Sequence, residues 1–169
     1  MIGFELRKSM NASETPQLFY FIIDNSEVVT IGDAVYINTD GHAGLLTAGI
    51  KVGGIVAQVV DKNGIAIASD SGTLNTYTVD SDNETVDQVK VGIYMSKDLL
   101  FATDSSGTLA TTNLLQFFDV TDEDTINQGS ASDTAGQFQL IGLDPDGDAD
   151  ASKGLFRIAE SQLDAYVQQ

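Results

Sequence analysis

Residues 88–96 read QVKVGIYMS, and hydrophobic side chains occupy every second position of this stretch. The alternation separates an apolar set from a more polar set: Val89, Val91, Ile93 and Met95 against Gln88, Lys90, Gly92 and Tyr94. A period of two residues is what a half-buried β-strand requires, because successive side chains point to opposite faces of a sheet. The stretch therefore predicts a strand with one face in the hydrophobic core.

Similar short segments recur along the chain: LFYFII, DAVYIN, GGIVAQVV, GIAIAS, TLNTYTV, LLQFF, GQFQLIGL and GLFRIAES. Turn-forming stretches lie between them: IDNSE, NTDGHAG, VDKNG, SDSG and TDSSG. Many short strands at close spacing are typical of barrels and sandwiches. We therefore predict an all-β fold with a small β-barrel or sandwich core. The tail after Leu155 also fits a helical stripe, and we expect a strand to about Glu160 followed by a short helical or loose segment.

The 169 residues fit one domain, or a core with an appendage. We expect an N-terminal arm over residues 1–17, because the polar stretch SMNASET precedes Pro16. A β domain would then cover residues 18–169. Within it, the long acidic segment 61–136 is a candidate for a second β lobe inserted into the first.

The net charge is −17, and its distribution is uneven. No Lys or Arg occurs from Asp98 to Ser152, where there are eleven acidic residues. Such a surface repels phosphate backbones and anionic lipids, which argues against nucleic acid or a membrane as partner. The longest apolar run, 18–23, is too short to cross a bilayer. No apolar run typical of a signal peptide follows Arg7 and Lys8, so we expect synthesis in a cytoplasm.

The composition offers little for catalysis. The chain has no cysteine, and its single histidine, His42, lies in the turn TDGHAG, where we expect it to be exposed to solvent. Paired carboxylates can hydrolyse glycosides without histidine, and two acidic groups are candidates: Asp80, Asp82 and Glu84, and Asp122, Glu123 and Asp124. The chain has no tryptophan to bind a sugar ring. We interpret both groups as acidic turns and expect no enzyme activity.

The stretch GLDPDGDADASKG carries four aspartates on alternate positions: Asp144, Asp146, Asp148 and Asp150. Counted from the first aspartate, an EF-hand needs glycine at its sixth position and glutamate at its twelfth, where this chain has Ala149 and Leu155. A looser cage of oxygen ligands for calcium remains open. The alternative is a solvated loop of a long hairpin, since Pro-Asp-Gly is a strong turn signal. In that case the chain has no cofactor.

One part of the chain resembles a known family. The segment EVVTIGDAVYIN is followed by the turn TDGHAG and by LLTAGIKVGGIVAQVVDKNG. This order is similar to that of the head decoration, or cement, proteins of tailed bacteriophages. Their "G-D-A-V" strand start corresponds to residues 32–35, the "A-G" step to Ala48 and Gly49, and the "G-(I/V)-V" strand to residues 54–56. The likeness is strongest over residues 28–60. VKVGIYMS and GLFRIAES also resemble later strands of that family.

The resemblance implies a non-enzymatic virion protein on the outer surface of the capsid. Such proteins often form trimers and bridge neighbouring major capsid subunits. The major capsid protein would be the partner, and the N-terminal arm would supply contacts through Phe4, Arg7, Lys8 and Pro16. Two alternatives stay open. One is another virion component: a fibre base, a tail part or a receptor-binding module. The other is a secreted β module that binds calcium or carbohydrate through the Asp144–Asp150 loop.

Overall fold

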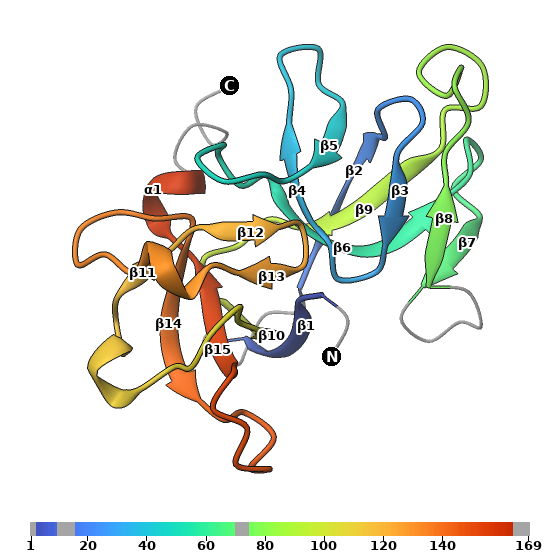
Figure 1. Cartoon of the computed structure of the whole chain (residues 1–169). Coiled ribbons are helices and arrows are strands. Elements are labelled where there is room, and N and C mark those ends of the chain that lie inside the picture. Colours follow the sequence, from blue (N-terminus) through green and yellow to red (C-terminus); the bar gives the residue numbers. More distant parts are fainter. Residues whose placement is uncertain (1–2, 10–15, 70–74, 164–169) are drawn as a thin grey trace.

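The computed structural model describes residues 3–9, 16–69 and 75–163. These residues form short antiparallel strands, two turns of 3₁₀ helix at Thr111–Asn113 and Gln128–Ser130, and one short helix, α1 (Glu160–Leu163). Figure 1 shows the strands gathered into two main sheets. The prediction of an all-β fold is confirmed, as is the change from strand to helix near residue 160.

The first sheet contains the stretch that alternates most clearly. Its strand order is β2 (Leu18–Ile22), β9 (Lys90–Tyr94), β6 (Gly54–Val60), β4 (Ala34–Ile37) and β5 (Ala43–Leu45), and β7 (Ala66–Ser69) also pairs with β6. A separate pair, β3 (Val28–Thr30) and β8 (Thr76–Thr78), lies beside it. Val91 and Ile93 of β9 are fully buried, whereas Lys90 and Tyr94 are only half-buried. The alternation in the sequence thus predicted correctly that Val91 and Ile93 of β9 face the core.

The second sheet is built mainly from the C-terminal half. Its order is β1 (Glu5–Ser9), β10 (Leu99–Asp104), β15 (Lys153–Ile158), β14 (Phe138–Leu143) and β11 (Phe117–Phe118). The hairpin β12 (Val120–Asp122) and β13 (Thr125–Ile126) lies next to this sheet, and a bridge joins Ser105 to Ile126. The hairpin β14–β15 is the long one predicted around the aspartate loop.

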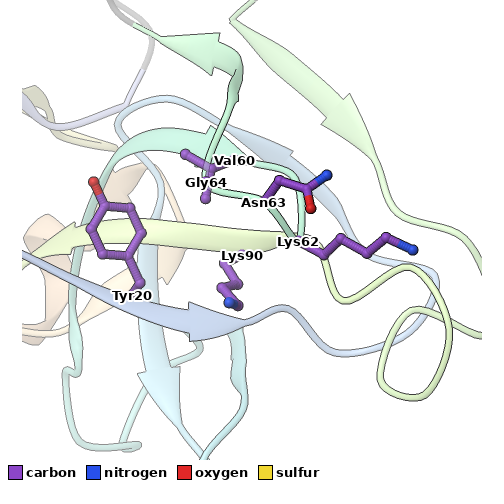
Figure 2. A pocket seen from close by; sticks show the side chains of 6 residues that line it. All are labelled: Tyr20, Val60, Lys62, Asn63, Gly64 and Lys90. Atoms are coloured by element: carbon purple, nitrogen blue, oxygen red, sulfur yellow. The ribbon is translucent and has the colours of Figure 1, made fainter.

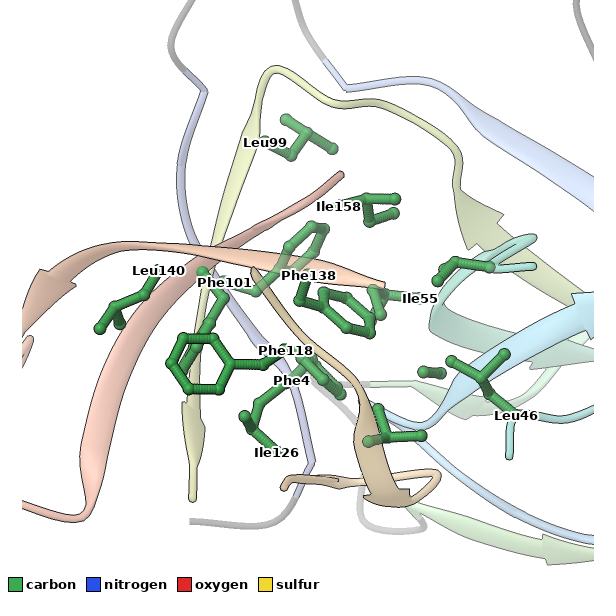
Figure 3. Close-up of a cluster of buried hydrophobic side chains, with 14 of the residues drawn as sticks. Phe4, Leu46, Ile55, Leu99, Phe101, Phe118, Ile126, Phe138, Leu140 and Ile158 are labelled. Carbon is green, nitrogen blue, oxygen red and sulfur yellow. The ribbon is translucent and has the colours of Figure 1, made fainter. Parts of the chain in front are cut away.

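Two clusters of buried side chains hold the sheets. One is aliphatic and lies within the first sheet, around Val59 and Val91. The other packs against the second sheet and is rich in phenylalanine (Figure 3): Phe4, Phe101, Phe118, Phe138 and Phe156. Leu46 and Ile55 from the first half of the chain also lie in this second cluster, which therefore packs the two halves against each other.

The predicted division into an arm, a core and an inserted lobe needs correction. Strand β1 falls inside the expected arm 1–17, yet it pairs with β10 as a regular strand of the second sheet. The strands of segment 61–136 are divided between the two sheets: β7 and β9 belong to the first sheet, and β10 and β11 to the second. The segment therefore does not form a separate lobe, because its strands pair with strands that come before it and after it in the sequence.

Candidate functional site

Three connections at one end of the first sheet bring together Asp24, His42 and Glu84. Asp24 follows β2, His42 lies in the turn between β4 and β5, and Glu84 lies in the segment between β8 and β9. All three connections are at the top of Figure 1. One ligand-type atom from each side chain lies within 4.8 Å of the others. Nδ1 of His42 is 3.8 Å from Oδ1 of Asp24 and 3.6 Å from Oε2 of Glu84.

Backbone pairing explains why Asp24 meets His42. An isolated bridge pairs Ile23 with Ala43, and the N–H of Asp24 donates to the carbonyl of Ala43 at 2.9 Å. Asn38 shapes the turn that carries His42, since its side-chain oxygen accepts from the N–H of His42. Asn38 also donates its amide to Oδ1 of Asp24 at 3.0 Å. The two connections are therefore fixed to each other before any ligand is considered.

Asparagines also hold Glu84 in place. Asn25 and Glu84 bind reciprocally: the N–H of Asn25 donates to Oε1 of Glu84, and the N–H of Glu84 donates to Oδ1 of Asn25. The next residue inward, Asn83, is fully buried. Its side chain donates to the carbonyls of Ile23 and Val89 and accepts from the N–H of Val89. These bonds leave Oε2 of Glu84 directed toward the imidazole.

The site carries an excess of negative charge. Partial burial, followed by the charge of Glu84, raises the pKa of Asp24, although His42 opposes this shift. Burial and the charge of Asp24 likewise raise the pKa of Glu27. Among the described residues no Lys or Arg forms an ion pair with Asp24 or Glu84. Two carboxylates thus face one imidazole.

Only part of this cluster could be anticipated from sequence. His42 was expected to be exposed, but its side chain keeps only 21% of its accessible surface. Glu84 was grouped with Asp80 and Asp82, which are exposed to solvent and are not part of the cluster. Asp24 was not singled out. The available signal was that IDNSE, TDGHAG and SDNET are all polar turns, but their meeting depends on strand order.

The second acidic group lies beside the G-D-A-V segment. Asp122, Glu123 and Asp124 form the turn between β12 and β13, and the carbonyl of Glu123 accepts from the N–H of Ala34. Asp33 is buried below them, and its Oδ2 accepts from the N–H of Thr30 at 2.6 Å. Burial, and then the neighbouring carboxylates, raise the pKa of Asp33 to about 7. The Asp33 side chain therefore closes a structural turn.

In the Asp144–Asp150 loop, protein groups already engage the four carboxylates. Asp144 accepts from the N–H groups of Asp148 and Ala149, and Asp150 accepts from Ser152. Nζ of Lys153 lies 2.7 Å from Asp148, 3.6 Å from Asp146 and 3.9 Å from Asp150. Arg7 pairs with Asp146 from β1. Lys153, three residues after the last aspartate, therefore brings positive charge to three of the four carboxylates.

The predicted partner-binding residues of the N-terminus have different placements. Phe4 is only 2% exposed and stacks on Phe138, so it belongs to the core and cannot serve as a surface contact in this conformation. Arg7 is exposed but pairs within the chain with Glu5 and Asp146. Pro16 is half-buried just before β2. Lys8 lies in β1, and its side chain is outside the described residues.

Among the described residues, the exposed aromatic side chains lie in strand β2. Phe19 and Tyr20 are each 47% exposed, and among the described strands β2 pairs only with β9. A cavity of about 430 Å³ beside Tyr20 is lined by Lys62, Asn63 and Lys90 among others. Figure 2 shows the two lysine side chains pointing in different directions, so the cavity does not focus their charges on one point. The edge of β2 is therefore the more suitable contact surface.

Comparison with known proteins adds no relative. No protein-family model, curated protein or solved structure matches the chain. Within residues 3–9, 16–69 and 75–163, no helix has the length and apolar character needed to span a membrane.

Proposed function

We propose that the chain is a head decoration protein of a tailed bacteriophage. In this role it is a non-enzymatic structural protein that binds the outer surface of the capsid, as a homotrimer, and bridges neighbouring major capsid subunits. The observation that carries the proposal is the resemblance of residues 28–60 to the decoration proteins.

The placement of the resembling residues fits a structural role. Residues 28–60 include β3, β4, β5 and β6, and the G-D-A-V residues 32–35 are all buried. Gly54, Ile55 and Val56 are buried as well. Glycines in such positions allow close approach of backbones, and none of these side chains is available for chemistry. The order of these motifs would thus specify a scaffold.

The surface chemistry also agrees with a position outside a DNA-filled shell. A net charge of −17 disfavours binding to DNA and favours solubility before assembly. The exposed edge of β2, with Phe19 and Tyr20, can add to a strand of another protein while its aromatic side chains bury apolar area. We assign capsid contact to this edge in place of Phe4.

The direct test is binding to capsid shells. Expanded shells of the phage that encodes the chain, prepared without this protein, are mixed with the purified chain and sedimented. We expect saturable co-sedimentation, and a higher melting temperature of the decorated shells. Tyr20→Glu should weaken binding, whereas Leu115→Glu, at a 64% exposed position just before β11 of the second sheet, should not. Failure of the wild-type chain to bind shells would contradict the proposal.

A further inference from the structure

We propose that Asp24, His42 and Glu84 form a binding site for a divalent transition-metal ion of the Zn²⁺ class. The proposal is independent of the capsid role. It rests on the donor set, on the spacing of the donor atoms and on the way the three connections are held together.

The donor set combines one imidazole nitrogen with two carboxylate oxygens. This combination suits Zn²⁺ and its first-row neighbours, whereas Ca²⁺ and Mg²⁺ prefer oxygen ligands alone. The set differs from the acidic turns elsewhere in the chain because it contains the only histidine. The three side chains are also withdrawn from solvent, with exposed fractions of 20% for Asp24, 21% for His42 and 34% for Glu84.

The spacing leaves room for an ion between the donors. Ligand atoms about 2.1 Å from a tetrahedral ion lie about 3.4 Å from one another. The distances of 3.6 Å and 3.8 Å from Nδ1 of His42 to the two carboxylates are close to that value. Both are longer than a hydrogen bond. Three protein ligands leave a fourth position for water.

Hydrogen bonds with Asn25, Asn38 and Tyr36 orient the two carboxylates. Asn25 engages Oε1 of Glu84, which leaves Oε2 for the ion. Asn38 donates to Oδ1 of Asp24, and such hydrogen bonds to ligating carboxylates are typical of metal sites. The ligands come from three connections. A bound ion would therefore cross-link the end of β2, the β4–β5 hairpin and the segment before β9.

The test uses the full chain without a polyhistidine tag, freed of metal with a chelator and titrated with ZnCl₂ in a calorimeter. We expect one Zn²⁺ per chain. His42→Ala, Asp24→Asn and Glu84→Gln should each weaken binding by at least about 10-fold. Asp40→Asn is the matched control, because Asp40 is an exposed carboxylate in the same turn as His42. Its affinity should equal that of the wild type.

A second measurement does not depend on any variant folding. The chain has one histidine, so its imidazole gives a single set of NMR signals. We expect Zn²⁺ to shift these signals in proportion to occupancy and Ca²⁺ at the same concentration to leave them in place. The proposal is overturned if Zn²⁺ binds without moving the imidazole signals, if His42→Ala binds with wild-type affinity, if no single-site binding occurs, or if Ca²⁺ produces the same shift.

Discussion

The ring of Phe4 stacks on that of Phe138, with centroids 4.5 Å apart and planes inclined by 21°. The N–H of Phe4 also donates to the carbonyl of Gly32 at 2.7 Å. Phe138 belongs to β14 in the second sheet, and Gly32 opens the G-D-A-V segment of the first half. The N-terminal residues thus connect the two halves of the fold.

Phe4→Ala should therefore destabilise the whole protein. Removing a buried phenylalanine leaves a cavity and typically costs about 3–5 kcal/mol of the free energy of unfolding. Phe19→Ala is the control, because Phe19 is 47% exposed and its loss should cost well under about 2 kcal/mol. Urea denaturation of both variants measures the difference. Equal stability of the two variants would mean that Phe4 does not occupy the core.

Asp33 should make stability depend on pH. Its pKa in the folded protein is about 7, whereas an unfolded aspartate titrates at about 4. Between these values the folded state holds a proton that the unfolded chain has lost, so stability falls as pH rises through this window. The gap corresponds to at most about 4 kcal/mol.

Asp33→Asn should remove this contribution, because an amide oxygen can still accept from Thr30 and carries no charge. We expect the variant to gain stability relative to the wild type at pH 8 but little at pH 4, as measured by urea denaturation at both values. Other carboxyl groups with a raised pKa, such as Asp24, are present in both proteins, so their contributions to the pH dependence cancel in the comparison. A wild type and variant with parallel pH profiles would contradict the burial of a titrating Asp33.

Replacing glycine by alanine should change the stability of the protein differently at two strand positions, Gly54 and Gly142. A Cβ at Gly54 would lie 2.6 Å from the carbonyl oxygen of Tyr94 on the neighbouring strand, whereas a Cβ at Gly142 would make an ordinary 3.5 Å contact with Leu155. Gly54→Ala should thus cost about 1–3 kcal/mol through overpacking against backbone. Gly142→Ala should be much milder. Thermal and urea unfolding compare them, and a harmless Gly54→Ala would indicate a different pairing of β6 with β9.

Lys153 should stabilise the aspartate loop through charge. Its hydrogen bond to Asp148 lowers the pKa of that carboxyl, and Asp146 and Asp150 also lie within 4.0 Å. Lys153→Met should lower the melting temperature, more at low salt than at high salt, because salt screens exposed charges. Lys51→Met, at an exposed lysine, is the control. Identical melting of both variants at every salt concentration would show that the loop does not need the lysine.

The period of the hydrophobic residues predicted the strands well, since a strand such as β9 must alternate to bury one face. The sequence did not reveal the position of Phe4. We expected an N-terminal arm because the polar stretch SMNASET precedes Pro16, and Phe4 lies within that arm, three positions before Arg7. Its burial depends on a partner, Phe138, more than a hundred residues away in sequence.

The cluster of Asp24, His42 and Glu84 could not be predicted from the sequence for a related reason. Each residue lies in a polar turn, which alone indicates only solvent exposure. The order β2-β9-β6-β4-β5 and the bridge from Ile23 to Ala43 bring the turns together, and neither can be read from local patterns. In contrast, the failure of the EF-hand spacing at Ala149 and Leu155 was visible in the sequence, although the role of Lys153 was not.

The most direct test of the proposed function is electron cryomicroscopy of the particles of the encoding phage, with and without the gene for this chain. The decoration role predicts additional density on the outer capsid surface, present throughout the shell, that fits the two-sheet fold and disappears with the gene. A copy number set by the capsid, rather than by the tail, should accompany it. Particles with identical shells in both preparations, or the protein located only at the tail, would contradict the role.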